Sequence, residues 1–144
     1  MELSSPSFEN GGVIPTKYTK KGGNISPPLI FSNVPENAKS LVLTMDDPGG
    51  PLITFVHWLI WNIPPNTTKI LEGEKIIYPQ GKNILRKHGY VGPCPPFGIH
   101  RYFFKLYALD KTIDLEPGAN KKRLEIAISK HIIAEAHMIG TAKK

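Results

Sequence analysis

The fold of this chain centres on the stretch Gly92-Pro93-Cys94-Pro95-Pro96-Phe97-Gly98-Ile99-His100-Arg101-Tyr102. Proline fixes φ and lacks a backbone donor, whereas glycine tolerates positive φ, so three prolines and two glycines within seven residues predict a rigid, irregular loop. The aromatic and aliphatic residues 102–109 then predict a buried strand. A rigid loop that carries a histidine, an arginine and a tyrosine to the start of a core strand is a favourable frame for a preorganised site.

Short apolar runs bounded by turn residues make up most of the remaining chain. The run 54–63 is almost continuously apolar, so we expect a strand buried on both faces. We predict further strands at 29–31 and 40–45, a short edge strand at 13–15, and a weak strand at 75–78. This pattern predicts a mainly antiparallel β domain.

The hydrophobic period changes only near the C-terminus. Asn120 is suited to be a helix N-cap, and Leu124, Ala127, Ile128 and His131 follow at helical spacing. The run 132–139 contains no glycine or proline and predicts a second short helix that ends at Gly140. We therefore expect one or two C-terminal helices in a single domain, residues 1–144.

Length and composition place the chain among globular proteins. Its 144 residues are 40% hydrophobic and 21% charged, and no apolar run reaches the length of a membrane span. The first residues have neither a basic nor an apolar segment of a secretory signal, and Cys94 is the only cysteine. These features predict a cytoplasmic protein. A high content of isoleucine and lysine with a single glutamine is typical of thermophilic proteins.

The net charge of +6 raises the question of nucleic-acid binding. The basic residues are dispersed, and no zinc-ligand spacing, recognition helix or aromatic RNA-binding motif accompanies them. We interpret the charge as a solvated basic surface and expect no specific nucleic-acid partner.

Five polar residues stand out by their placement: Asp46, Asp47, His57, His100 and Tyr102. The carboxylates follow a predicted strand, His57 interrupts the most apolar strand, and His100 closes the rigid loop. A buried histidine is commonly just a hydrogen-bonded core residue. Two histidines with a carboxylate instead favour an anion site, because histidine titrates near neutrality and a carboxylate fixes its tautomer. The Tyr102 hydroxyl and loop amides would add donors.

Other interpretations of these side chains have less support. Cys94 is expected to be a small buried hydrophobic residue rather than a reactive thiol. Arg101 fits an ion-pair partner as well as a ligand contact. Asp47, His57 and His100 could form a two-histidine, one-carboxylate metal site, but their wide spacing does not require one. We expect no metal and no cofactor. No Gly-x-Ser-x-Gly nucleophile motif or phosphate-binding Gly-x-x-x-x-Gly-Lys segment occurs.

Several of these segments together resemble the phosphatidylethanolamine-binding protein family. The resemblance rests on Asp47-Pro48-Gly49-Gly50-Pro51, His57-Trp58, and the Gly92–Tyr102 stretch. The Asn24–Pro28 opening and the closing 134–141 segment resemble the prokaryotic, Raf-kinase-inhibitor-like branch. The likeness therefore extends over nearly the whole chain.

The resemblance implies a large central antiparallel sheet, a smaller sheet packed on it, and helices at one edge. It also implies a small pocket for phosphate-like anions, with residues 92–96 as one wall, and a cis peptide before Pro51. The ligand-binding residues expected on this basis are Asp47, His57, Pro93, Cys94, Gly98, His100 and Tyr102.

Two positions depart from the family pattern. Gly49 stands where the first motif usually has a second acid, which predicts a less negative or wider pocket. Ala142 stands where the prokaryotic branch often has an aromatic residue, which predicts a more open pocket on that side.

Membership in such a family leaves the function open among three hypotheses. The first is a non-enzymatic module that binds a phosphate-like or carboxylate anion and inhibits or regulates a partner. The second is a serine protease inhibitor, with chymotrypsin-like or elastase-like targets, that uses a rigid loop from 46–51 or 79–97. The third is a weak hydrolase with His57 and His100 as acid and base. A homodimer through the apolar C-terminal segment also stays open.

Overall fold

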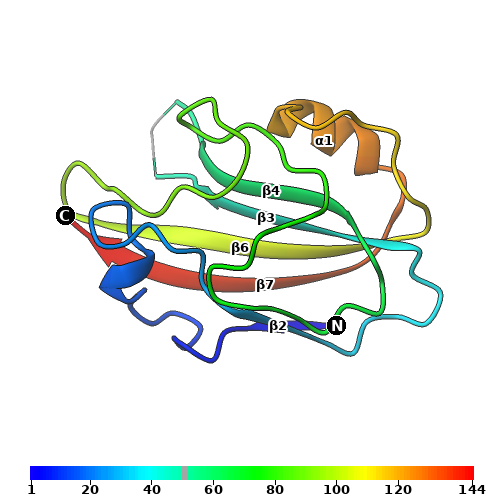
Figure 1. Ribbon diagram of the computed structural model, residues 1–144, viewed down its shortest axis with the longest axis horizontal. Coiled ribbons are helices and arrows are strands. Elements are labelled where there is room, and N and C mark those ends of the chain that lie inside the picture. Colours follow the sequence, from blue (N-terminus) through cyan, green and yellow to red (C-terminus); the bar gives the residue numbers. More distant parts are fainter. Residues whose placement is uncertain (50–51) are drawn as a thin grey trace.

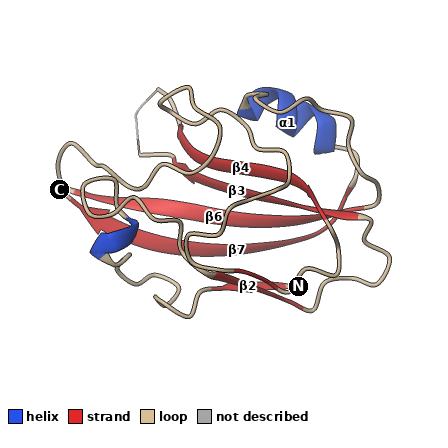
Figure 2. Cartoon of the chain, viewed as in Figure 1, coloured by secondary structure: helices blue, strands red, loops and turns tan. Residues whose placement is uncertain are grey.

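A computed structural model describes residues 1–49 and 52–144, and its architecture is two antiparallel sheets packed face to face, with one α-helix (Figures 1 and 2). In spatial order, the four-stranded sheet of the described chain contains β4 (Phe55–Ile63), β3 (Ser40–Asp47), β6 (Ile99–Leu109) and β7 (Ile132–Lys143). The three-stranded sheet contains β1 (Glu2–Ser4), β2 (Leu29–Ser32) and β5 (Lys69–Ile70). The helical segments are the 3-10 helix η1 (Thr16–Tyr18) and α1 (Lys121–Ile128).

The two faces of the larger sheet are covered by different elements. Leu41, Leu43 and Met45 of β3 point into the core shared with the smaller sheet. Val42, which alternates with them, packs instead with Leu124 of α1. This is the period-two alternation of a pleated strand. Every residue of β3 is consequently buried, and β3 occupies an inner position in its sheet.

The structure confirms most of the predicted elements. The strands at 29–31, 40–45, 54–63 and 102–109 are present, and the 54–63 strand is largely buried, as expected. The helix is also present, and the Asn120 side chain caps it by accepting the Arg123 amide at 2.9 Å. Within the described residues, no helix has the length and apolar character needed to cross a bilayer.

The prediction of a second helix at 132–139 is wrong, because this segment is β7. From Ala136 onward its residues alternate between buried and less buried, and the strand pairs with β6 along its whole length, for example Met138 with Phe104. The absence of glycine and proline allowed a helix, but pairing with a strand distant in sequence decided the conformation.

The weak strand predicted at 75–78 is also wrong, since this segment is loop. The 13–15 segment forms only an isolated bridge, Val13 with Thr141. Conversely, the short strands β1 and β5 were not predicted, because two or three residues carry no measurable alternation.

Candidate functional site

The topology brings three predicted site segments together at one end of the larger sheet. Because β3 runs antiparallel to both of its neighbours, its C-terminal end lies beside the beginnings of β4 and β6. Asp47 pairs with Phe55 in one ladder, and Asp46 pairs with Phe103 in the other. His57 and His100 therefore reach the same end of the sheet as Asp47, although they are far apart in sequence.

Asp47 is the buried anchor of this end. Its Oδ2 accepts a hydrogen bond from His100 Nδ1 at 2.6 Å, and its Oδ1 accepts the Gly49 amide at 2.7 Å. Asp47 is 2% exposed, and each of its carboxylate oxygens accepts a hydrogen bond from within the protein, as is expected of a buried polar group. The arrangement fixes the orientation of the His100 ring and leaves its Nε2 for a ligand.

His57 is held by the backbone of the loop opposite. Its Nδ1 donates to the Val91 carbonyl at 2.7 Å, and the Val91 amide donates to the His57 carbonyl at 3.0 Å. Burial lowers the pKa of His57 below its ordinary 6.5, an effect that outweighs the Val91 carbonyl and the nearby Asp47 and Asp46. The ring is therefore neutral near pH 7, with an unprotonated Nε2.

Tyr102 lies against this histidine. Its ring meets that of His57 edge to face, with centroids 5.1 Å apart. The side chain is buried, and burial together with the charge of Asp47 raises the pKa of the hydroxyl, which therefore stays protonated. Tyr102 can donate a hydrogen bond to an acceptor on a ligand.

These groups open onto a cavity of about 320 Å³, which we call the histidine pocket. Polar residues and an apolar wall share its lining. The lining residues are Lys20, Asp47, Phe55, His57, Ile84, Leu85, Val91, Gly92, Cys94, Pro95, Pro96, His100 and Tyr102.

Five of the seven predicted ligand-binding residues, Asp47, His57, Cys94, His100 and Tyr102, line this pocket. The other two, Pro93 and Gly98, are absent from its lining. The Pro93 carbonyl accepts the Lys20 amide at 3.0 Å, and Gly98, at a φ of +69°, accepts the Lys144 amide at 3.2 Å. Both therefore hold the loop in place in this structure.

The expectation that Cys94 is buried is wrong, because its side chain is exposed. Pro93 and Pro95 on either side are buried, so the loop turns the intervening residue outward. The aspartate pair is also divided: Asp46 forms an ion pair with Lys121 of α1 on the opposite face of the sheet.

Sequence reasoning missed the apolar part of the pocket. Ile84 and Leu85 come from a segment that looked like a featureless polar loop. Backbone hydrogen bonds attach this segment to β4, with the Ile84 amide on the Val56 carbonyl at 2.8 Å and the Gly81 amide on the Leu59 carbonyl at 3.0 Å. Adjacent apolar residues within a polar stretch were the one available signal.

The two departures from the family pattern have different positions. A Cβ atom added at Gly49 would lie 2.8 Å from Asp47 Oδ1 and 3.2 Å from His100 Nδ1, so a side chain there would press on the pair. Ala142 lies outside the histidine pocket and lines a neighbouring cavity.

The predicted cis peptide before Pro51 lies outside the described residues. Within residues 1–49 and 52–144, no group of three His, Cys, Asp or Glu side chains is placed to hold a metal ion.

Comparison with known proteins gives consistent matches over the full chain. A family model described as "Phosphatidylethanolamine-binding protein" matches residues 4–143. A Methanothermobacter thermautotrophicus protein, named only as a UPF0098 protein, is 47% identical over 150 residues, which cover 100% of this chain and 99% of the relative. A Chlamydia trachomatis UPF0098 protein is 44% identical and covers 100% and 99%.

Two solved structures match the fold closely. A phosphatidylethanolamine-binding protein homologue from Chlamydia trachomatis has a TM-score of 0.95 at 43% identity, covering 99% of this chain and 97% of that one. Escherichia coli YbcL, described as a new member of the mammalian family, has a TM-score of 0.92 at 29% identity, covering 99% and 98%. These names state a family and no activity.

Proposed function

The chain belongs to the phosphatidylethanolamine-binding protein family, and from that premise we propose that it is a non-enzymatic module whose histidine pocket binds a phosphate-like or carboxylate anion and thereby inhibits or regulates a partner protein. One observation carries the proposal. Asp47 fixes the orientation of the His100 ring, and the Val91 carbonyl fixes that of the His57 ring. Both rings line the same cavity, and each has its Nε2 left for a ligand.

The donors and acceptors of the pocket restrict the anion. Tyr102 is a donor, and a protonated His100 would present Nε2–H while Asp47 balances its charge. His57 differs, because its Nδ1–H is used by Val91 and its neutral Nε2 can only accept. The best ligand therefore has acceptor oxygens and one hydrogen to donate, as in a monohydrogen phosphate or a phosphate ester with an ammonium group.

Titration followed by NMR tests this proposal directly. Inorganic phosphate and phosphoethanolamine, added to millimolar concentration, should shift the ring resonances of His57 and His100. His131 is a matched control, because it also pairs with an aspartate, Asp110, at 2.9 Å but does not line the pocket. The proposal fails if His57 and His100 respond no more than His131.

The pH dependence tests the role of the rings. If a protonated histidine holds the anion, the affinity should fall as the pH rises through the pKa of that histidine in the complex. A flat profile would assign the binding to Tyr102 and loop amides instead. His100→Ala should weaken binding in the first case and leave it nearly unchanged in the second.

A second candidate function, inhibition of serine proteases, is favoured by one exposed residue. Phe97 is 73% exposed and stands between Pro96 and Gly98, so a rigid loop presents an aromatic side chain to solvent. A chymotrypsin-like S1 pocket accepts such a side chain. Saturable, stoichiometric inhibition that Phe97→Ala removes would support this candidate, whereas simple digestion of the chain at the loop would exclude it.

A further inference from the structure

A second cavity, of about 340 Å³, lies beside the histidine pocket. Ala142 of β7 is directly opposite His100 of β6 in the strand ladder, so the two side chains share one face of the sheet. His100 lines the histidine pocket and Ala142 lines the second cavity, while Cys94 and Pro95 line both. We call this second hollow the lysine cavity. It is lined by Val13, Ile14, Thr16, Thr19, Lys21, Gly22, Pro93, Cys94, Pro95, Ala142, Lys143 and Lys144.

One part of the lysine cavity is apolar. Ile14 and Ala142 are buried at 2% and 5% exposure, and Pro93 and Pro95 are also buried. Val13 is 71% exposed, so this part of the cavity lining presents an aliphatic side chain to water. A ligand with an apolar body would remove this surface from water.

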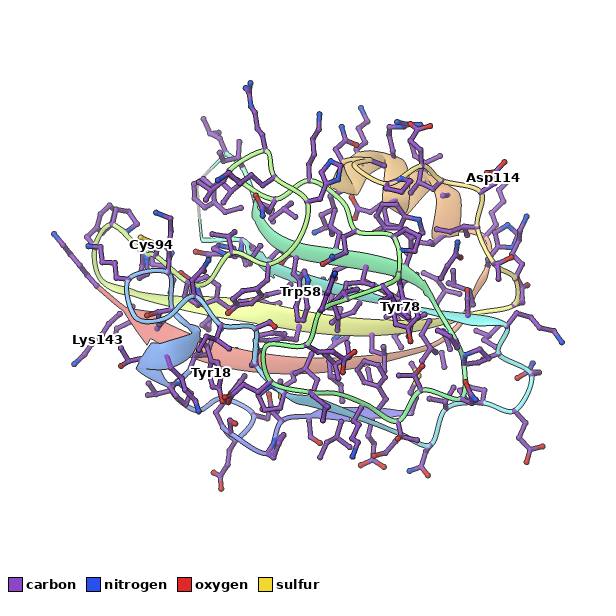
Figure 3. The ribbon with its side chains drawn as sticks, viewed as in Figure 1. Tyr18, Trp58, Tyr78, Cys94, Asp114 and Lys143 are labelled. Atoms are coloured by element: carbon purple, nitrogen blue, oxygen red, sulfur yellow. The ribbon has the colours of Figure 1, made fainter. Side chains whose placement is uncertain are left out.

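Another part of the cavity lining is cationic. Lys21, Lys143 and Lys144 line it, no acidic side chain does, and none of the three makes an ion pair with the described residues. Nearby Lys17 is different, since it pairs with Glu72 at 2.9 Å. Figure 3 shows Lys143 and Cys94 at the same end of the molecule. The charge of the cavity is therefore free to meet an anion.

Backbone contacts hold the cavity walls in place. The Ile14 amide donates to the Thr141 carbonyl at 2.8 Å, and the Lys20 amide donates to the Pro93 carbonyl at 3.0 Å. A Cβ atom at Gly22 would lie 1.8 Å from the Thr16 carbonyl oxygen, so only glycine permits this turn. A preformed cavity needs little ordering when it binds a ligand.

We propose that the lysine cavity is a second binding site, for an amphiphilic anion: a carboxylate or phosphate attached to an apolar group of small-molecule size. The apolar group lies against Val13, Ile14 and Ala142, and the anionic group pairs with Lys21 and Lys143. A bare inorganic anion leaves the apolar surface uncovered, and a neutral molecule leaves the lysines unused. The site does not depend on anion binding in the histidine pocket.

Calorimetric titration with octanoate tests the charge requirement. Lys21→Glu/Lys143→Glu should weaken octanoate binding by roughly tenfold or more, because two attractive charges become repulsive. Lys111→Glu/Lys130→Glu makes the same change in net charge at two exposed lysines outside the cavity and should leave the affinity within about twofold. Equal losses in both variants would overturn the proposal.

Companion ligands test the amphiphilic requirement. Acetate should bind far more weakly than octanoate, and so should octan-1-ol. If octanol bound with the same affinity as octanoate, the lysines would contribute nothing to binding, and the proposal would be overturned. Tighter binding of the peptide acetyl-Glu-Glu-Leu-Glu-Glu-amide than of octanoate would also overturn it, in favour of an acidic protein segment.

Variants at the facing pair Ala142 and His100 assign the site. Ala142→Phe should fill the lysine cavity and abolish octanoate binding, while His100→Ala should leave it intact and reduce phosphate binding. If Ala142→Phe does not fold, amide shifts of Gly22 and Ala142 in the wild type give the same assignment. Loss of octanoate binding in His100→Ala would place the ligand in the histidine pocket and exclude the second site.

Discussion

Asp46 and Asp47 are neighbours in β3, yet they belong to opposite faces of the sheet. Asp46 pairs with Lys121 and helps to fasten α1, whereas Asp47 pairs with His100 and accepts the Gly49 amide at the pocket. The pleat of the strand enforces this separation, since successive side chains point in opposite directions. Two consecutive acids in a strand are therefore two separate sites.

The two faces of the larger sheet also differ in how they are filled. On the helix side, Val42, Trp61 and Leu124 pack with less than 2% exposure. On the other side, Asp47 and His57 border a cavity. We infer that substitutions on the helix face change stability and that substitutions on the pocket face change ligand binding.

The largest expected effect is on the helix face. Leu124→Ala removes a fully buried side chain between α1 and the sheet and should lower the free energy of unfolding by about 2–5 kcal/mol. Urea denaturation measures this change. Phosphate affinity, measured by calorimetry where the variant is still folded, should stay within about twofold of the wild type. A large loss of affinity without a loss of stability would contradict the division between the faces.

A pair of matched substitutions tests the division at adjacent positions. Asp47→Asn removes the charge that fixes His100 and should weaken phosphate binding by about tenfold, or about 1.4 kcal/mol. Asp46→Asn should leave phosphate binding unchanged and lower the free energy of unfolding by about 1–3 kcal/mol, because Lys121 loses a charged partner. Calorimetry and urea denaturation on both variants provide the comparison. Equal losses of phosphate affinity would mean that the two carboxylates act together.

The sequence predicted those elements whose signal is local. The apolar run 54–63, the cap residue Asn120 and the proline-rich loop each carry their own pattern. The structure confirms the strand and the cap, and it confirms the irregular loop as far as Gly98, because β6 begins at Ile99, three residues before the predicted strand. The 132–139 segment carries only a short pattern of this kind, the alternation of Ala134, Ala136 and Met138 with Glu135 and His137. This period-two signal favours a strand, but the prediction gave more weight to the lack of glycine and proline. Pairing with β6, more than twenty residues earlier in the chain, holds the segment as a strand.

The residues of the histidine pocket also fall into those that a local sequence signal revealed and those that it did not. The histidines, Asp47 and Tyr102 were found because polar residues in apolar or proline-rich surroundings are conspicuous. Ile84 and Leu85 were missed because their role depends on how one loop attaches to β4. The exposure of Cys94 was missed for a related reason, since the direction of a loop side chain follows from the backbone around it and not from its hydrophobicity.

The smallest expected effect concerns the titration of His57 on the pocket face. Burial lowers its pKa in the folded protein below the ordinary 6.5 that applies when the chain is unfolded. As the pH falls below about 6.5, the unfolded chain takes up a proton that the folded protein does not, so the free energy of unfolding decreases. The decrease continues until the pH reaches the folded pKa of His57 and then stops.

His57→Asn isolates this contribution. The asparagine amide can still donate to the Val91 carbonyl, but it does not titrate. Urea denaturation from about pH 7 to about pH 5 should therefore show a shallower loss of stability in this variant than in the wild type. Identical slopes for the wild type and His57→Asn would mean that His57 is protonated equally in both states. In that case burial would not keep the His57 ring neutral, and the argument that His57 Nε2 accepts a hydrogen bond from a ligand would fail.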